Sequence, residues 1–508
     1  MVQDSYTKNY IQIYFWQGIS LVLNFFSMFV VIPFLASNPI IYGIYSICIS
    51  VSVFLAYADF GFISAGQKYA AEYFSIGDTQ EEIKTIGFSN FILLAFLLLF
   101  SICFLFLSYN PSLLISGLSS AATISTASSL LFILAIFTPV TLLQRVLQMI
   151  CGIRLEDFII QRSTIIGSLF KITSVLWFFR SGSYDIVGYF LFLQVINLLT
   201  AIITLFIVKR KYNYNFLAIF KAIKFDSKVY QKTKNLAFTS LFMTISWILY
   251  YELDSLVIGK YFGAKQVAIY AIGITLLTFF RSILGILFSP FNARFNHFVG
   301  VNDDKGLKSF FLQIVVILAP VVVLPIIVIT MLAFPLLLSW VGTDYKESVE
   351  IAQYLVLCNL FAFITYPTGI LLMAKEQIKK MYSINMLLPF VFWIGILSTY
   401  QILGLRSFAI FKMVAFILSA LVYYAFMLKY LKMPILKSLK LIFKPMILPI
   451  LFVVVSCLIF HDYLPTDKSK INLLLVAFVS GFLILVSFCI QYFFSENWRK
   501  QISKVLKK

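Results

Sequence analysis

The sequence has little charge and few of the groups on which catalysis depends. Only 12% of its 508 residues are Asp, Glu, Lys or Arg, whereas charged residues make up about 25% of a typical soluble domain. It has two histidines, and none of its cysteines has metal-ligand spacing. No phosphate-binding loop, nucleophile elbow or paired-histidine metal motif occurs at a credible position. These absences exclude an ordinary soluble domain, argue against an enzyme, and predict neither a cofactor nor a metal site.

Long apolar runs stand where charge is missing. Hydrophobic residues make up 61% of the chain, and the mean hydropathy is +0.95. Runs of about 18 or more apolar residues, long enough to cross a bilayer, recur along the whole length, and the first is too long for a signal-peptide core. We predict an all-α polytopic membrane protein with about fourteen transmembrane helices, at residues 11–35, 41–62, 86–108, 125–150, 158–179, 185–208, 235–259, 266–290, 310–334, 350–374, 382–402, 406–428, 442–460 and 471–493.

The distribution of basic residues predicts the topology. If the N-terminus is cytoplasmic, the inner connections, their flanks and both termini hold 30 of the 40 Lys and Arg residues, and the outer connections hold seven. This bias follows the positive-inside rule, so both termini are predicted to be cytoplasmic. Because the basic residues are scattered among the connections, the net charge of +19 does not indicate nucleic-acid binding.

The richest basic stretch, residues 209–234, contains eight Lys or Arg and one acid. Phe216, Phe220 and Ile223 recur there at helical spacing beside a stripe of lysines, a pattern typical of a helix in the membrane interface. A basic cytoplasmic loop without a further role explains the stretch equally well. Both interpretations place it on the cytoplasmic side.

An internal repeat divides the chain. Four landmarks recur in the same order at a shift of about 225 residues: 43–50 with 268–275, 72–78 with 297–303, Pro111 with Pro335, and Pro139 with Pro367. We therefore predict two six-helix lobes of equal topology, related by a parallel pseudo-two-fold repeat, with two extra C-terminal helices. The predicted division is an N-lobe at 1–208, a basic cytoplasmic linker at 209–234, a C-lobe at 235–430, and accessory helices with a basic tail at 431–508.

Three basic residues, Lys171, Arg281 and Lys412, fall inside predicted spans. Charge is costly in lipid and usually faces a bundle interior or an aqueous cavity. Lys171 and Arg281 lie ~20 Å and ~22 Å from the nearer span ends counted along the helix, too deep to snorkel easily. We expect both to line a cavity, whereas snorkelling explains Lys412 equally well. Deep basic groups suit an anion such as phosphate.

Further candidates lie at or near span ends. Arg145 and Arg154, at the cytoplasmic end of the fourth span, are either ordinary positive-inside residues or an entry funnel for an anionic ligand. Asp59 is either a solvated helix-end carboxylate or a lumen group. Glu252 and Asp254 are two apart on a helix, so at most one is expected to point inward.

Three segments resemble Wzx-type polysaccharide flippases. Residues 57–78, from YADFG to IGD, resemble the end of their second span. Residues 254–270, which begin DSLVIGKYFG, resemble their second-lobe signature, and residues 371–376 (LLMAKE) resemble their junction between spans 10 and 11. The resemblance covers at least residues 1–430.

What the resemblance implies is the fold of the multidrug/oligosaccharidyl-lipid/polysaccharide (MOP) exporter superfamily, with two six-helix lobes around a central cavity. It implies a flippase that moves undecaprenyl-pyrophosphate-linked oligosaccharide across the bacterial cytoplasmic membrane by alternating access, for O-antigen or capsule assembly. Membrane lipids, a polysaccharide polymerase and a chain-length regulator are the implied partners, and H⁺ or Na⁺ is the candidate coupling ion. In the family's cationic lumen Lys171 and Arg281 would bind pyrophosphate, and Asp59 or Asp254 would couple the ion.

Three alternatives stay open. A cation-coupled multidrug exporter of the same fold would have an acidic lumen, which the deep basic residues disfavour. A membrane enzyme of polysaccharide assembly would need a large catalytic loop. A lipid II flippase is the third alternative. Related lipid II flippases carry charged residues in their first span, and this chain has only Gln17 and Asn24 there, which disfavours that function.

Overall fold

The computed structural model describes residues 2–55, 57–180, 183–212 and 214–506, and within these ranges it is built of helices without strands. Asn213 of the predicted linker and residues 507–508 of the predicted tail lie outside the described residues. The chain divides into two compact units, Met1–Ala268 and Ile269–Lys508, here named the N-unit and the C-unit. The predicted lobe boundary at 209–234 stays a prediction.

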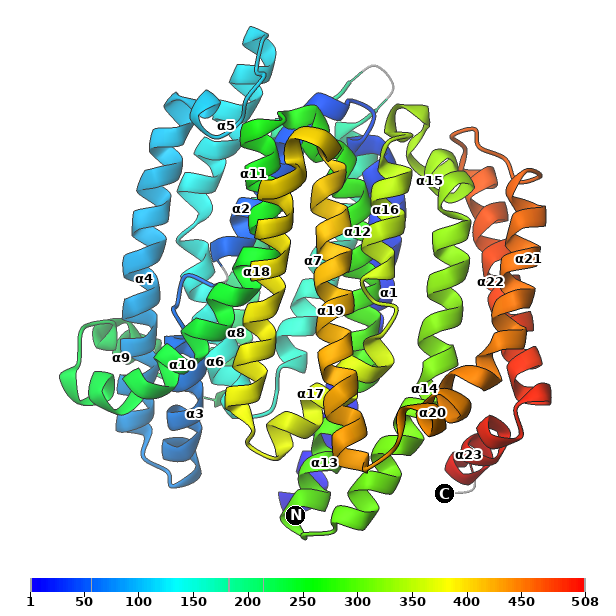
Figure 1. Ribbon diagram of the computed structural model, residues 1–508. Coiled ribbons are helices and arrows are strands. Elements are labelled where there is room, and N and C mark those ends of the chain that lie inside the picture. Colours follow the sequence, from blue (N-terminus) through cyan, green and yellow to red (C-terminus); the bar gives the residue numbers. More distant parts are fainter. Residues whose placement is uncertain (1, 56, 181–182, 213, 507–508) are drawn as a thin grey trace. The chain divides into compact units, whose positions relative to one another are not determined.

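The helices of the N-unit follow one another with short connections (Figure 1). They are α1 (Val2–Leu35), α2 (Pro39–Leu55), α3 (Phe62–Ser75), α4 (Thr79–Tyr109), α5 (Ala121–Phe137), α6 (Val140–Ile153), α7 (Phe158–Phe178), α8 (Ile186–Tyr212), α9 (Phe216–Ala222), α10 (Ser227–Tyr251) and α11 (Leu253–Tyr261), with the short η1 (Pro111–Leu113). The next helix, α12 (Ala264–Phe288), runs across the boundary between the units.

The C-unit continues in the same way. Its helices are α13 (Phe291–Gly300), α14 (Asp304–Met331), α15 (Ala333–Val341), α16 (Ser348–Leu357), α17 (Ala362–Ala374), α18 (Ile378–Leu403), α19 (Arg406–Leu431), α20 (Ile435–Ser438), α21 (Ile447–His461), α22 (Lys470–Phe494) and α23 (Glu496–Leu506), with the short η2 (Thr343–Tyr345), η3 (Leu439–Phe443) and η4 (Lys444–Met446).

The fourteen predicted spans coincide with these helices. Within the described ranges nine helices are long and apolar enough to cross a membrane, and three more spans are helix pairs bent by more than 40°. The two remaining predicted spans correspond to α7, which carries Arg162 and Lys171, and to α2, a shorter apolar helix. The chain is therefore an all-α, multi-pass membrane protein. The predicted connection 63–85 contains the helix α3 and the first turns of α4.

The repeat is visible in local structure inside each unit. Asp78 caps α4 by accepting a hydrogen bond from the Glu81 N–H at 3.1 Å. Asp303, 225 residues later, caps α14 by accepting one from the Gly306 N–H at 2.8 Å. A side-chain cap of this kind satisfies a backbone donor that the first helical turn leaves unpaired.

Other repeated features follow in order. Gly117 and Gly342, also 225 apart, have positive φ angles of 74° and 99°. Two of the bent pairs, α5 with α6 and α16 with α17, are each bent by 44°. Pro139 lies at the first of these bends, whereas the second occurs at residues 358–361 and Pro367 lies inside α17. The predicted pairing of Pro139 with Pro367 is therefore wrong.

The basic stretch after α8 contains the short helix α9. Phe216 and Ile219 are buried, while Leu217 and Phe220 are exposed. The helix packs on α4 so closely that a Cβ at Gly87 would lie 2.4 Å from the Ala222 carbonyl oxygen. The helical part of the prediction is confirmed, and Phe216 is buried against protein.

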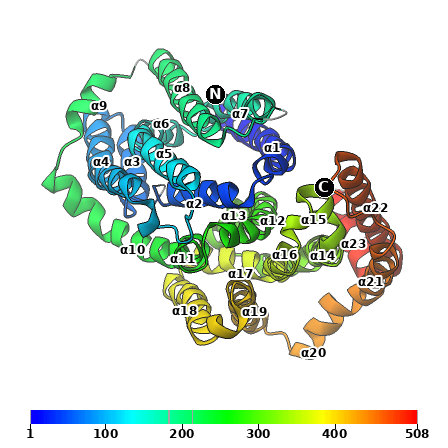
Figure 2. The same ribbon diagram turned by 90° about the horizontal axis from the view of Figure 1, so that it is seen from above.

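The two accessory spans pack within the C-unit. A core of buried aliphatic side chains joins α14 and α15 to α21 and α22, which lie beside them in both views (Figures 1 and 2). Its central members are Leu324, Val328, Leu332, Leu336, Val453, Cys457, Val476 and Leu483. The Trp498 indole of α23 donates a hydrogen bond to the Ile317 carbonyl at 3.0 Å and ties the C-terminal helix to α14.

Candidate functional site

Three helices of the N-unit carry polar residues at helical spacing on otherwise apolar surfaces. Thr141, Gln144, Arg145 and Gln148 follow one another on α6, and Thr164 and Lys171 lie two turns apart on α7. On α8 the series is Gln194, Asn197, Thr200 and Thr204. Since residues three, four and seven apart share a helix face, each helix presents one polar stripe.

The stripes line two adjoining cavities in the N-unit. The first, of about 280 Å³, is bounded by α2, α5, α6 and α8, and its polar lining residues are Ser52, Thr138, Thr141, Gln144, Arg145, Gln148, Gln194 and Asn197. The second, of about 210 Å³, is bounded by α6, α7 and α8, and its polar lining residues are Gln144, Gln148, Thr164, Lys171, Asn197, Thr200 and Thr204. Gln144, Gln148 and Asn197 belong to both. Neither lining includes an acid.

Close packing of α7 on α8 positions Lys171. Gly167 lies one turn before it, and a Cβ there would lie 2.7 Å from Thr200 Cγ2 and 3.2 Å from Ile196 Cγ2. This approach brings Lys171 Nζ to 2.6 Å from Asn197 Oδ1, to which it donates a hydrogen bond. The ammonium is thus held in the second cavity by an uncharged acceptor, which leaves its charge available to an anion.

Arg145 supplies the cation that lines the first cavity. Its Nη1 donates to Gln148 Oε1 at 2.8 Å, and its charge acts on the carboxylate of Asp59. Because α6 continues to Ile153, Arg145 lies about 12 Å along the helix from its end at ~1.5 Å per residue. This is deeper than the helix-end position predicted.

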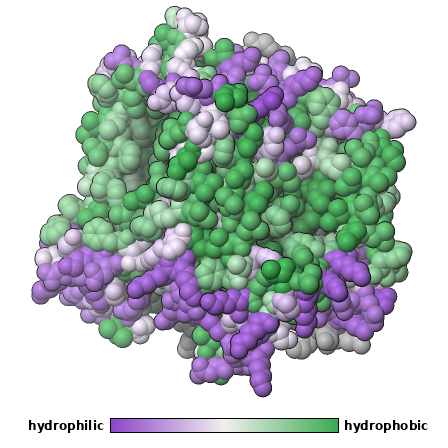
Figure 3. Space-filling view, in the orientation of Figure 1, coloured by the Kyte–Doolittle hydropathy of each residue, from purple (hydrophilic) through white to green (hydrophobic). Residues whose placement is uncertain are grey.

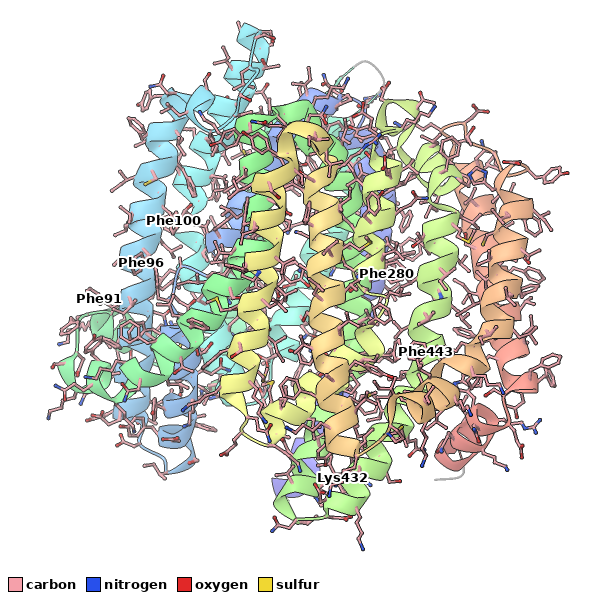
Figure 4. All side chains as sticks on the ribbon, in the orientation of Figure 1. Phe91, Phe96, Phe100, Phe280, Lys432 and Phe443 are labelled. Carbon is pink, nitrogen blue, oxygen red and sulfur yellow. The ribbon has the colours of Figure 1, made fainter. Side chains whose placement is uncertain are left out.

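Asp59 lies where the second span is broken. It follows the end of α2, and Phe60 and Gly61 after it have positive φ angles of 50° and 81°. Its Oδ2 accepts a hydrogen bond from the Ile63 N–H at 3.0 Å, which caps the first turn of α3. The Phe60 ring lies 4.1 Å from the ring of Phe96 on α4, labelled in Figure 4. The fourteen residues of α3, about 21 Å of helix, separate Asp59 from the turn into α4. The predicted place of Asp59 near the span end stays a prediction.

The other predicted acids mark a second break in the N-unit. Glu252 lies at the 41° bend between α10 and α11. Asp254, in the first turn of α11, is buried and accepts a hydrogen bond from the Ser255 N–H at 2.8 Å. Neither residue is among those that line the two cavities.

Arg281 and Lys412 belong to the C-unit. Arg281, on α12, is partly buried and interacts electrostatically with Tyr366 of α17. Lys412, on α19, is buried with its Nζ 5.1 Å from the centre of the Phe392 ring. Snorkelling does not describe Lys412, because only 1% of it is exposed. The structure therefore groups Lys171 with Arg145 and Asp59, and places Arg281 and Lys412 in the other unit.

Arg154 lies outside both cavities and forms a buried ion pair at the ends of three N-unit helices. Its Nη2 is 2.9 Å from Glu82 Oε1, and the Glu82 side chain is fully buried. The guanidinium also lies over the rings of Phe74, Tyr212 and Tyr214 at 4.4 to 5.1 Å from their centres. Such contacts add cation–π attraction to the ion pair. We name Glu82, Arg154 and Tyr214 the clamp.

The clamp holds the start of the basic stretch against α4 and α6. The Tyr214 hydroxyl donates to Glu82 Oε1 at 2.9 Å. Burial, and then the charge of Glu82, raise the pKa of Tyr214 far above its usual value, so the phenol stays protonated and acts as a donor. Beside it, Glu156 accepts hydrogen bonds from Lys211 and Tyr212.

Sequence reasoning missed the uncharged half of the cavity. Gln144, Gln194, Asn197 and Thr200 are uncharged, so the rarity of charge inside a span does not identify them. Their signal was present as polar residues recurring at three- and four-residue steps in α6 and α8.

No protein-family model and no curated protein matches the sequence. Solved structures do match. Lipid II flippase MurJ, in an inward closed conformation, superposes with a TM-score of 0.64 at 15% identity, over 93% of this chain and 98% of the other. This chain has the MOP transporter fold. An inward-facing multidrug resistance MATE family transporter of the MOP superfamily matches with a TM-score of 0.60 at 13% identity, over 82% and 94% of the two chains. A MOP superfamily transporter from Pyrococcus furiosus matches with a TM-score of 0.56 at 13% identity, over 84% and 96%.

The MOP fold agrees with the predicted architecture of this chain. The matched structures are described as a flippase and transporters.

Proposed function

We propose that this protein is a flippase for undecaprenyl-pyrophosphate-linked oligosaccharide, working by alternating access in the bacterial cytoplasmic membrane for O-antigen or capsule assembly. The observation that carries the proposal is the cationic, amide-rich lining of the N-unit cavities, which contains Lys171 and Arg145 and no acid. The fold it shares with a lipid II flippase supports the same class of substrate.

The lining chemistry suits the two parts of such a head group. Lysine and arginine are the usual partners of phosphate oxygens, as a point charge and as a bidentate donor. The neighbouring Gln144, Gln148 and Asn197 can donate to and accept from sugar hydroxyls. The polyprenyl tail would remain in lipid. Arg281 of the C-unit stays a predicted phosphate-binding residue.

The acids would couple transport to an ion gradient. Asp59 lies at a helix break and within the field of Arg145, so a change in its protonation would alter the charge that Arg145 offers the substrate. Asp254 is the second candidate because it is buried beside the α10–α11 bend. A ligand or proton drives a change of state only by its different affinity for the two states.

The test is surface polysaccharide in cells that depend on this protein. Lys171→Ala with Arg281→Ala is expected to abolish surface polysaccharide while the protein stays in the membrane at its normal level. Lys221→Ala, on exposed α9, removes one positive charge away from the cavities and is expected to complement fully. Complementation by the double variant contradicts the proposal.

The second candidate is a multidrug exporter, since MATE transporters share the fold. The carboxylate of Asp59 is the observation that favours it, because a cation exporter needs an acid in its path. It predicts that drug resistance falls in Asp59→Asn while surface polysaccharide is unchanged. The Pyrococcus furiosus structure is described as one whose reversed pocket polarity suggests a different function, and pocket polarity is also what separates the two candidates here.

A further inference from the structure

A basic pocket lies in the C-unit, at the end where α17 leads into α18 and where α19 finishes. Its volume is about 190 Å³. It is lined by Thr368, Leu371, Leu372, Lys375, Gln377, Lys380, Phe426, Lys429 and Tyr430. The positive-inside bias assigns this end of the C-unit to the cytoplasmic side.

The three lysines of the pocket differ in how they are neutralised. Lys375 is held by Asp304, with Nζ and Oδ1 2.7 Å apart, and Asp304 is also paired with Lys308 at 2.9 Å. Lys380 donates to the uncharged Gln377 Oε1 at 2.7 Å. Among the described residues no carboxylate lies within ion-pair distance of Lys380 or Lys429. The pocket therefore keeps two positive charges that its own acid does not balance.

A buried hydroxyl in the wall has no protein partner. Thr368 is 0% exposed, and its Oγ1 makes no hydrogen bond to any described residue. A buried hydroxyl without a hydrogen-bond partner costs about 1–3 kcal/mol of stability. A ligand oxygen that accepts a hydrogen bond from Thr368 would recover this free energy. The Tyr430 hydroxyl, in contrast, is already committed to Asp304 at 3.0 Å.

An apolar wall completes the pocket. Leu371 and Leu372, which are buried, follow Thr368 on the same face of α17, and Phe426 of α19 lines the pocket with them. On the face drawn in Figure 3, hydrophobic side chains cover the middle of α18 and α19 and hydrophilic ones gather below them. Figure 4 shows Lys432 at that lower end of α19, just after Lys429 and Tyr430. The pocket thus lies where a lipid head group meets its acyl chains.

We propose that this pocket binds the phosphate of an anionic phospholipid of the cytoplasmic leaflet. Lys380 and Lys429 hold the phosphate oxygens, Thr368 donates its hydroxyl, and the apolar wall takes the glycerol and the first acyl carbons. Free phosphate has the same negative charge as the lipid head group but has no glycerol or acyl carbons. The apolar wall therefore favours the lipid as the ligand. This site is independent of the cavities of the N-unit.

The test measures lipid binding by native mass spectrometry of the purified full-length protein, titrated with phosphatidylglycerol and, separately, phosphatidylcholine. The wild type is expected to bind phosphatidylglycerol at least tenfold more tightly. Each lysine near an anionic head group contributes ~1 kcal/mol, so Lys380→Gln with Lys429→Gln is expected to weaken phosphatidylglycerol about 30-fold.

The control is Lys437→Gln with Lys440→Gln, which removes the same charge from exposed positions on α20 and η3. It is expected to leave the affinity within about twofold. An equal loss of phosphatidylglycerol affinity in the control overturns the proposal, because the lipid would then be attracted by the general positive charge of the protein and not by this pocket. A competition experiment tests the lipid assignment. If inorganic phosphate displaces the lipid as effectively as glycerol phosphate does, the lipid assignment is overturned.

Thr368→Val tests the hydroxyl without changing shape. The proposal expects severalfold weaker phosphatidylglycerol binding together with an unchanged or raised Tm, because the variant removes an unpaired buried group. A raised Tm with unchanged affinity removes Thr368 from the site.

Discussion

The two halves of the repeat differ at their second helix, which lies in the N-unit in the first half and mostly in the C-unit in the second. In the N-unit that helix breaks after α2, at Asp59, Phe60 and Gly61, and resumes as α3. In the C-unit the corresponding residues, 284–286, lie inside the unbroken α12. The break accompanies the polar cavities of the N-unit. Most of the largest fully buried side chains, such as Trp340, Tyr345 and Phe363, belong to the C-unit.

The difference shows where a duplicated bundle can tolerate polar groups. A helix break inside a membrane protein frees backbone groups that need partners, and Asp59 supplies one at Ile63. A second contrast lies at the helix ends. Glu82 of the clamp corresponds, 225 residues later, to Leu307, an apolar residue that is buried on α14.

The largest expected effect comes from replacing Glu82 by the residue of the other unit. Glu82→Leu leaves the Arg154 charge buried and unpaired, and removing one partner of a buried ion pair costs about 3–5 kcal/mol. The variant is expected to lower the Tm strongly in a detergent thermal-unfolding assay. Glu82→Leu with Arg154→Met is expected to recover most of the loss, because apolar replacement of the whole pair is often neutral.

The control is Glu72→Gln. Glu72 is an exposed acid 4.0 Å from Lys232, and its replacement should change the free energy of unfolding by less than ~1 kcal/mol. A single variant as stable as the wild type would show that the clamp contributes nothing.

A smaller effect is expected at the break itself. Gly61→Ala meets both a positive φ and a Cβ position only 2.5 Å from the Ala237 carbonyl oxygen, so it should cost about 1–3 kcal/mol. Gly285→Ala, in the unbroken α12, has nothing within 4 Å of the new Cβ and should be stabilising by about 0.5–1 kcal/mol. Paired unfolding curves measure both. Equal effects of the two substitutions would remove the contrast between broken and unbroken helices.

The smallest effect should be the same in both units. Asp78→Ala and Asp303→Ala each remove an N-cap with one backbone hydrogen bond, at a typical cost of ~1 kcal/mol. We expect the two losses of unfolding free energy to agree within about 0.5 kcal/mol. A large difference between the two losses of unfolding free energy would mean that the two N-caps do not stabilise their helices equally.

The architecture was predictable because it follows from patterns that every span repeats. Apolar run length predicts a span whatever its partners, and the 225-residue shift aligns Asp78 with Asp303 and Gly117 with Gly342. The break at Asp59 was not predictable from hydropathy, because the predicted span 41–62 runs through Asp59, whereas the backbone changes direction there through positive φ angles at Phe60 and Gly61.

The candidate site was predictable only in part. Lys171 stands out because a cation deep in a span is rare. Its grouping with Arg145 and its hydrogen bond to Asn197 depend on how α6, α7 and α8 pack, which sequence spacing within one helix does not contain. The role of Arg154 was not predictable from the sequence, because its partners Glu82 and Tyr214 are distant in sequence and come together only in the fold.

The most direct measurement is the affinity of the purified protein for an undecaprenyl-pyrophosphate-linked oligosaccharide, compared between the wild type and Lys171→Gln with Arg145→Gln. The account predicts that the double variant binds at least about 30-fold more weakly, since each charge-assisted hydrogen bond to phosphate is worth about 1.5–3 kcal/mol. Lys437→Gln should bind like the wild type. Unchanged affinity in the double variant would contradict the claim that the N-unit cavities receive the pyrophosphate.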